Sequence, residues 1–259
     1  MDQRIIDLIA PHTGAIDHTE EVTTGYGVST TLRVDAVEGR FFLKATPNEP
    51  GGNLDAARRE AAVGPFVAGV SPRVRFTVED STWFVVAFDL LDARPSDFTS
   101  GSADLPVVID TVNRMSTGTS LPPDLVLEWE ETRWDRFTTE DEKPLLKGVS
   151  LIHADIHERN LLISDGHGWL VDWEWPTAGA EVIVPGCLAV QLVASGHSPE
   201  AAEKWVSETV SWQNASLEAR AVFARVDARM HRWLAKVRGE KWLEAMAEAA
   251  EAWAAHVDT

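Results

Sequence analysis

Hydrophobic and polar positions along the first 90 residues predict two pairs of strands around one helix. β-branched and aromatic residues dominate residues 30–35 and 39–45, and the turn-like residues between them predict a β-hairpin. Apolar residues at helical spacing predict a helix over residues 54–67. Residues 74–78 and 83–88 predict the second strand pair, so the expected order is strands, helix, strands.

From residue 89 onward helical patterns dominate, and short strands are expected only at 161–163 and 169–171. Residues 92–101, which contain an Arg-Pro-Ser sequence, form the natural linker between the two differently built parts. By length alone, 259 residues allow either one large domain or two lobes. Three terminal helices are predicted, over residues 198–212, 215–237 and 240–257.

The composition is that of a globular protein with an acidic balance. Apolar residues make up 44% and charged residues 25% of the chain, which excludes disordered and fibrous classes. The net charge of −18 argues against a nucleic acid partner, because phosphate backbones select Lys and Arg. The first 90 residues hold 13 acidic and 8 basic side chains, and the remainder holds 28 and 15. An acidic cleft for a cationic substrate and a solvated acidic surface are both open interpretations.

Signals for membranes and disulfides are missing from the sequence. No apolar run reaches the roughly 18 residues that a membrane span needs, and no secretory core follows the first residues. We therefore expect a cytoplasmic protein without a membrane partner. The single Cys187 has no partner for an internal disulfide, and its apolar neighbours predict a small buried side chain.

The sharpest chemical signal lies in residues 151–174. Asp155 is followed five positions later by Asn160 and then by a short hairpin, and Asp172 follows an apolar strand. Phosphoryl transfer needs these parts, because catalysis mainly positions an alcohol in line with the γ-phosphate and neutralises charge. Asp155 would orient and deprotonate the hydroxyl, while Asn160 and Asp172 would give Mg²⁺ the oxygen ligands it prefers.

This pattern, H-x-D-x-x-x-x-N followed by an apolar strand that ends in D-W-E, resembles the catalytic loop and metal-binding segment of the aminoglycoside phosphotransferase family. His157 matches a His that is usual in the family, and His153 would brace the loop. The resemblance implies an α+β fold of the two-lobed protein-kinase type. A small β-rich nucleotide-binding lobe would span 1–91, and a larger, mainly helical catalytic and substrate-binding lobe would span 92–259.

The resemblance also demands a Lys at a strand end and a Glu on the next helix, because the Lys must reach the phosphates and an ion pair must fix its direction. Lys44 and Glu60 meet this demand, and Asp55 is a weaker rival for the Glu. ATP is the expected phosphate donor, with GTP as an open alternative.

Two more segments of the first lobe are expected to contact the nucleotide. Gly25, Gly27 and Ser29 lie in a turn between suspected strands, where backbone N–H groups and the Ser29 hydroxyl could approach the phosphates. A plain hairpin turn is the alternative. By resemblance, main-chain groups near Asp89 and Leu91 would form the hinge that binds the nucleobase.

The sequence departs from the family pattern at two places. Glu158-Arg159 stands where Pro-Gly is often seen before the metal-binding Asn. The Asp expected shortly after the metal-binding segment is absent from the residues that follow Gly179, which raises the question of how the catalytic loop is buttressed.

The acceptor site is less legible. The resemblance points to Glu174, Trp175 and residues 128–135, where acids interleaved with aromatic residues would suit a cationic or sugar-like ligand. The alternative for residues 128–135 is a helix with Trp129 and Trp134 in the core and its acids in water.

We therefore expect a small-molecule O-phosphotransferase that moves the γ-phosphate of Mg-ATP to an aminoglycoside-like or other cationic or sugar-like acceptor. The alternative is a catalytically silent kinase-fold protein that binds nucleotide or ligand in a regulatory role. A protein kinase is disfavoured, because no A-P-E sequence follows Asp172. The acceptor, a role in antibiotic resistance and the oligomeric state are left open.

Overall fold

The computed structural model describes residues 2–22 and 28–258. The chain forms two compact units. The first comprises Met1–Ala93 together with Val171–Trp175, and the second comprises Arg94–Leu170 together with Pro176–Thr259. The segment Val171–Trp175 thus returns to the first unit from a position far along the sequence.

The first unit is built on a five-stranded antiparallel sheet with the order β1-β2-β3-β5-β4. The predicted hairpin is confirmed, because β2 and β3 pair from Thr30 and Ala45 down to Ala36 and Gly39. The predicted pair β4 and β5 is confirmed as well. The strands are β1 (Ile16–Glu21), β2 (Thr30–Ala36), β3 (Gly39–Pro47), β4 (Val74–Glu79) and β5 (Trp83–Asp89).

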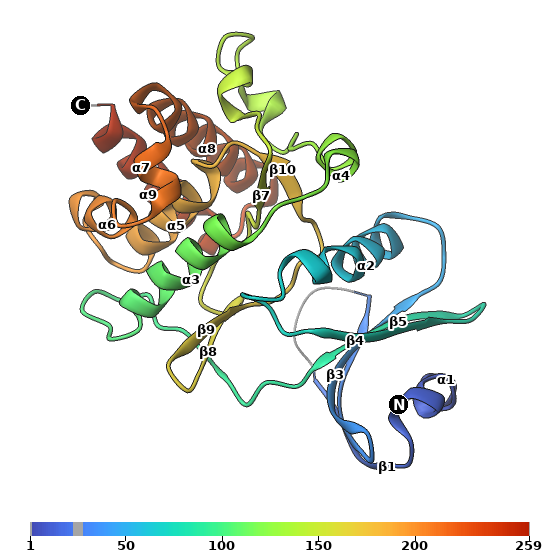
Figure 1. The fold of residues 1–259 in the computed structure, drawn as a ribbon. Helices are drawn as coiled ribbons and strands as arrows, with labels where there is room; N and C mark the ends of the chain where they lie inside the picture. Colours follow the sequence, from blue (N-terminus) through green and yellow to red (C-terminus); the bar gives the residue numbers. More distant parts are fainter. Residues whose placement is uncertain (1, 23–27, 259) are drawn as a thin grey trace. The chain divides into compact units, whose positions relative to one another are not determined.

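Two helices cover opposite faces of this sheet (Figure 1). Helix α1 (Gln3–Thr13) buries Ile5 and Ile9 against the face that carries Leu43. Helix α2 (Gly52–Val63) packs Leu54 and Ala57 on the other face. Because successive side chains of a strand point to opposite faces, Lys44 lies on the α2 face of β3.

The helix predicted over residues 54–67 is shorter than expected. Helix α2 ends at Val63, and a 3-10 turn, η1 (Gly64–Phe66), follows it. Pro65 has no backbone N–H to continue the α-helical hydrogen bonds, which explains the change of helix type. The prediction was therefore right in kind and wrong at the end of the helix.

The second unit has two small sheets. β6 (Arg94–Pro95), β8 (Leu161–Ser164) and β9 (His167–Leu170) form one, and β7 (Ser150–Ile152) pairs with β10 (Thr177–Gly179) in the other. β8 and β9 are joined by Asp165 and Gly166, both with positive φ, as a tight two-residue hairpin turn requires. β6 lies inside the stretch that was predicted to be a plain linker.

Helices make up most of the second unit, and buried Trp and Phe side chains such as Trp134, Trp212, Phe223 and Trp253 form its core. The helix predicted over 198–212 is two helices, because the Thr209 side chain accepts a hydrogen bond from the Trp212 N–H and starts a new one. The helices are α3 (Leu105–Gly118), α4 (Pro123–Glu128), η2 (Asp135–Phe137), η3 (Lys143–Leu146), α5 (Ile183–Ala194), α6 (Pro199–Val206), α7 (Val210–Asn214), α8 (Leu217–Arg238) and α9 (Lys241–Val257).

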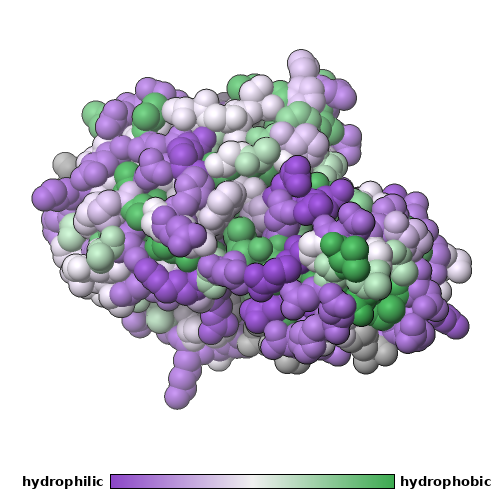
Figure 2. All heavy atoms as spheres, turned by 60° about the horizontal axis from the view of Figure 1, so that its bottom comes forward, coloured by the Kyte–Doolittle hydropathy of each residue, from purple (hydrophilic) through white to green (hydrophobic). Residues whose placement is uncertain are grey.

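The fold class is α+β, as predicted: one unit is a small antiparallel sheet with two helices, and the other is mainly helical (Figure 1). Among residues 2–22 and 28–258, no helix combines the length and the apolar character that crossing a bilayer requires. Hydrophilic residues cover most of the face drawn in Figure 2, with hydrophobic residues in smaller groups.

Candidate active site

Lys44 is the centre of a cluster of carboxylates in the first unit. Its Nζ donates hydrogen bonds to Glu60 Oε1 at 2.9 Å and to Asp172 Oδ1 at 2.5 Å. Glu174 Oε1 lies 3.7 Å from the same nitrogen. The side chains of Lys44 and Glu60 are only 13% and 4% exposed, whereas those of Asp172 and Glu174 are 42% and 53% exposed. The structure thus brings four predicted site residues together.

Local backbone geometry explains why these side chains meet. Glu60 is buried on α2, above the sheet face to which Lys44 points. Asp172 has a φ of 67°, a left-handed conformation that Asp tolerates better than most residues. The N–H of Trp173 donates to Glu60 Oε1 at 3.1 Å, which fastens the Val171–Trp175 segment to α2. Asp55, the weaker rival for Glu60, is exposed in the first turn of α2.

The charges of this cluster are strongly coupled. Burial on its own lowers the pKa of Lys44, but Glu60, Asp172 and Glu174 outweigh it and raise that pKa above its ordinary value. Burial raises the pKa of Glu60, and the nearby ammonium of Lys44 opposes that rise. Lys44 is therefore a permanently charged ammonium at neutral pH, held by carboxylates on one side.

Carboxylate oxygens of Glu60, Asp172 and Glu174 lie within 4.8 Å of one another, close enough to share a metal ion. Hard oxygen donors of this kind fit Mg²⁺. Glu60 is buried and already bonded to Lys44 and to the Trp173 N–H, so Asp172 and Glu174 are the better candidates for ligands. The residues present therefore fit a magnesium ion.

The second unit carries the predicted catalytic loop. The Nδ2 of Asn160 donates to the main-chain oxygen of Asp155 and to its Oδ2, both at 3.0 Å. The His157 ring lies against the same carboxylate, with Nε2 3.6 Å from Oδ2. The close contact with His157, followed by the charges of His157, His153 and Arg133, outweighs the effect of burial and lowers the pKa of Asp155. The 74% exposed Asp155 side chain is therefore ionised at neutral pH and accessible to a ligand.

Comparison with known proteins identifies the fold. The sequence matches no protein-family model and no curated protein. An aminoglycoside phosphotransferase from Alicyclobacillus acidocaldarius superposes with a TM-score of 0.68 at 12% identity, covering 100% of this chain and 95% of that chain. Choline kinase LicA from Streptococcus pneumoniae gives 0.66 at 13% identity, covering 98% of each chain. Spectinomycin phosphotransferase APH(9)-Ia, in complex with ADP and spectinomycin, gives 0.59 at 14% identity, covering 98% and 93%.

The chain has the aminoglycoside phosphotransferase fold. At 12–14% identity this likeness concerns the fold and leaves the activity to be argued from the residues. The predicted fold, with its β-rich and helical parts, is thereby confirmed.

Two more segments of the first unit were predicted to bind the nucleotide: the turn around Gly25, Gly27 and Ser29, and the hinge near Asp89 and Leu91. Gly25 and Gly27 lie outside the described residues. Ser29 directly precedes β2, and its hydroxyl lies 2.8 Å from the hydroxyl of Thr46 on β3. At the predicted hinge, the N–H groups of Asp89 and Leu90 are used by main-chain oxygens of Arg73 and Arg40. With these two N–H groups occupied, a nucleobase at this hinge could use the Leu91 N–H together with main-chain oxygens. The roles of Asp89 and Leu91 stay predictions.

The acceptor predictions have a mixed outcome. Glu174 is part of the Lys44 cluster, and the half-exposed Trp175 has the Arg59 guanidinium 4.6 Å from its ring centroid. Trp129 and Trp134 are buried, as the alternative interpretation expected. The helix of that interpretation is wrong, because α4 ends at Glu128. Its solvated acids are confirmed for the exposed Glu128 and Glu130 and wrong for the buried Glu131.

Glu131 shows why residues 129–131 are not helical. Its main-chain N–H donates to Ala178 O at 2.8 Å, and the Ala178 N–H donates to Trp129 O at 2.7 Å. Its carboxylate accepts hydrogen bonds from the Thr177 hydroxyl and from the Arg133 N–H. The segment is therefore held against β10 by main-chain and side-chain bonds, and no local sequence signal announces them.

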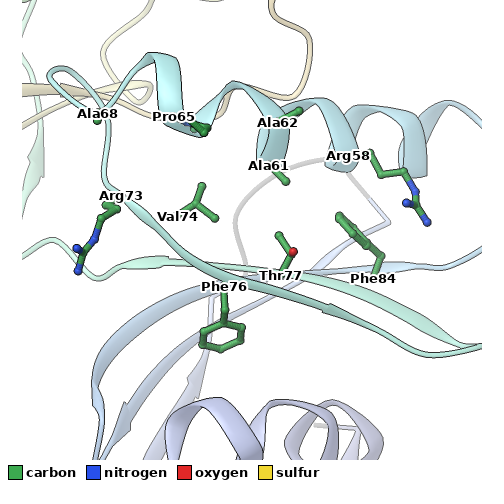
Figure 3. Close-up of a pocket in the computed structure, with 11 residues that line it drawn as sticks. Arg58, Ala61, Ala62, Pro65, Ala68, Arg73, Val74, Phe76, Thr77 and Phe84 are labelled. Carbon is green, nitrogen blue, oxygen red and sulfur yellow. The ribbon is translucent and has the colours of Figure 1, made fainter.

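A groove with a volume of about 670 Å³ lies elsewhere in the first unit, between α2 and β4 (Figure 3). Small and apolar residues such as Ala61, Pro65 and Val74 line it, and Arg58 and Arg73 lie toward its two ends. None of the predicted site residues lines this groove. Its position is therefore distinct from the Lys44 cluster.

Sequence reasoning assigned Glu174 only to the acceptor. The structure places it with Asp172 among the residues that could hold a metal. The signal that could have suggested this is the pair Asp172 and Glu174, which are separated by a single residue. Trp173 between them can turn inward while both carboxylates reach the same point.

Proposed function

We propose that the chain is a small-molecule O-phosphotransferase that uses Mg-ATP. The observation that carries the proposal is the buried Lys44 ammonium held between Glu60 and Asp172, because phosphoryl transfer needs a fixed cation for the phosphates. An exposed carboxylate, Asp155, bonded to a potential metal-ligand amide, Asn160, adds the second half of the machinery.

Asp155 would orient the acceptor. Its ionised carboxylate accepts a hydrogen bond from the acceptor hydroxyl and aims the oxygen at the γ-phosphorus. As the new O–P bond forms, the bond between the γ-phosphorus and the bridging oxygen of ADP breaks, and the hydroxyl proton passes to Asp155. The lowered pKa of Asp155 keeps its carboxylate ionised at neutral pH, so it can accept this hydrogen bond and then the proton.

Lys44 would bind the phosphates, and its direction is fixed by the Glu60 ion pair. Sequence resemblance assigns Asn160 and Asp172 to magnesium, and Glu174 joins Asp172 as a candidate ligand. Bound magnesium would neutralise phosphate charge and so lower the cost of bringing the hydroxyl close.

We propose a cationic or sugar-like alcohol as the acceptor. The net charge of −18 favours cationic ligands through the summed field. Proteins of this fold include a choline kinase and a spectinomycin phosphotransferase, and the latter was seen with ADP, which supports an adenine nucleotide as donor. GTP, and a silent protein that only binds nucleotide, are the alternatives.

Acceptor-dependent ADP release tests the proposal. The purified protein is incubated with Mg-ATP or Mg-GTP and a panel of aminoglycosides, choline, other amino alcohols and nucleosides, and the phosphorylated product is identified by mass. Asp155→Asn should lower turnover by about 10²- to 10⁴-fold. The exposed Asp141→Asn serves as the matched control and should retain full turnover. Nucleotide binding by calorimetry without turnover on any acceptor would favour the silent alternative, and full activity of Asp155→Asn would reject the assigned role.

A further inference from the structure

The catalytic loop between β7 and β8 is held at both ends by strands. β7 pairs with β10 immediately before His153, and β8 pairs with β6 and β9 immediately after Asn160. Between these ends, a local turn is closed by the N–H groups of Asn160 and Leu161, which donate to His157 O at 3.0 and 2.9 Å. These local bonds shape the loop but do not fix it to the rest of the unit.

Glu158 provides a link to a distant segment. Its Oε1 accepts a hydrogen bond from the N–H of Phe98 at 2.9 Å. Its main-chain oxygen accepts from the N–H of Ser96 at 3.2 Å, and the same N–H lies 3.0 Å from Leu161 O. Residues 96–98 therefore grip the loop next to Asn160 through one side-chain bond and through the main chain.

The gripping segment is itself rigid. Phe98 is fully buried and Ser96 is 4% exposed. The main-chain oxygen of Phe98 accepts a hydrogen bond at 2.9 Å from Nε2 of the buried His197, which must carry its proton there because a carbonyl oxygen can only accept.

A second set of bonds fixes the start of this segment. Asp104 binds the Arg94 guanidinium through both carboxylate oxygens, at 2.6 and 2.7 Å, and also accepts from the Asp97 N–H at 2.9 Å. A bidentate pair of this kind adds geometric specificity to its strength. The Phe98 main chain is thus a fixed point to which the catalytic loop can be tied.

We propose that Glu158 is a positioning residue that ties the catalytic loop to the Phe98 main chain and so fixes Asp155 and Asn160. This inference rests on the proposed function. Loss of the tether leaves the buried Phe98 N–H without its acceptor and lets the loop shift, and a 1 Å misplacement can cost about 10² in rate.

The test compares Glu158→Ala with Glu158→Gln, which keeps an oxygen acceptor in the same place but removes the charge. Glu248→Ala, on the exposed face of α9, is the matched control. Amide hydrogen exchange is measured on the full chain at Phe98, Asn160 and Leu161, and kcat and KM are measured with the acceptor that the screen identifies. If the Ala variant shows no cooperative unfolding, Glu158→Asp, which is one methylene too short to reach, takes its place.

We expect Glu158→Ala to speed exchange at Phe98, Asn160 and Leu161 by about tenfold or more. Its kcat should fall about 10- to 100-fold while KM for the nucleotide stays within about threefold, because Lys44 and Asp172, the other groups proposed to bind Mg-ATP, lie outside this loop. Glu158→Gln should restore both readouts to near the level of the control.

The proposed tether would be overturned if the Phe98 amide of Glu158→Ala exchanged at the wild-type rate, or if Glu158→Gln were as impaired as Glu158→Ala. It would also be overturned if the Phe98 amide exchanged faster while the exchange of Asn160 and Leu161 and the kcat stayed unaltered. A wild-type protein without any transferase activity would instead count against the proposed function. The exchange rates would still decide whether Glu158 holds the loop.

Discussion

Replacing Lys44 by Met should destabilise the protein strongly, because it leaves the buried Glu60 carboxylate without its cation. Breaking a buried ion pair from one side costs about 3–5 kcal/mol. The Trp173 N–H still donates to Glu60 Oε1 at 3.1 Å, which offsets about 1 kcal/mol. Asp172 and Glu174 are far more exposed, so losing their contacts with Lys44 adds little. The net cost is about 2–4 kcal/mol, or a fall in Tm of about 4–16 °C for a chain of this size.

Thermal and urea unfolding, followed by circular dichroism, measure this cost. The double variant Lys44→Met/Glu60→Gln removes both charges and keeps an acceptor for Trp173, so it should recover at least half of the lost stability. Lys204→Met, at an exposed position of α6, controls for the loss of a Lys and should unfold like the wild type. A Lys44→Met variant that unfolds within about 1 °C of the wild type would contradict a costly unpaired Glu60. A double variant less stable than Lys44→Met alone would contradict it as well.

Two further predictions concern the second unit. Hydrogen bonds from Arg229, with a smaller contribution from Arg225, lower the pKa of Glu142 to about 2, below its ordinary value of 4.5. Its stabilisation is therefore complete above pH 4.5 and is lost as the pH falls toward 2. Glu142→Gln should lower the free energy of unfolding by about 1–3 kcal/mol at pH 7. It should also make the urea midpoint less dependent on pH between pH 4.5 and 2. Equal pH dependence of the midpoint in the variant and the wild type would contradict this. Gly148→Ala would place a Cβ 2.7 Å from the main-chain carbon of Gly179 and should cost about 1–3 kcal/mol. Gly118→Ala, at the last residue of α3 with nothing within 4 Å, should cost nothing, so equal Tm values for the two Ala variants would refute the close approach.

The chemistry-bearing positions were the easiest to predict, because function imposes spacing. Lys44 on an apolar strand and Glu60 on the next helix follow from what a phosphate-binding cation needs, and the two side chains form the expected ion pair. β3 runs to Pro47, so Lys44 lies inside the strand and not at its end. The roles of Asp155 and Asn160 rest on a pattern within six consecutive residues, which the structure gathers into one hydrogen-bonded loop. Their part in catalysis stays a prediction.

Elements without a periodic pattern escaped the sequence analysis. β1, with the sequence Ile16-Asp17-His18-Thr19-Glu20-Glu21, is an edge strand that buries no residue fully. Among the described strands it pairs with β2 alone, and its sequence shows no hydrophobic alternation. Helix α1 buries just Ile5, Ile9 and Thr13, and it has a proline near its end. Both elements owe their conformation to the sheet on which they pack.

Tertiary bonds decided the segments that were predicted wrongly. Residues 129–131 pair with Ala178, which is nearly fifty residues away in the sequence, and this pairing overrides any local helical tendency. Tertiary bonds also explain the burial of Glu131. The Thr177 hydroxyl and the Arg133 N–H donate hydrogen bonds to its carboxylate and so satisfy it inside the protein.

The left-handed backbone of Asp172 has a practical consequence for anyone who wants an inert version of this protein. Asn tolerates that conformation almost as well as Asp, whereas Ala or a β-branched residue pays about 1–2 kcal/mol to adopt it. An alanine scan would therefore mix a backbone penalty with the loss of a ligand at this position. Exchanging a single oxygen for nitrogen, in Asp172→Asn, separates the two and gives the cleaner reagent for trapping a bound nucleotide.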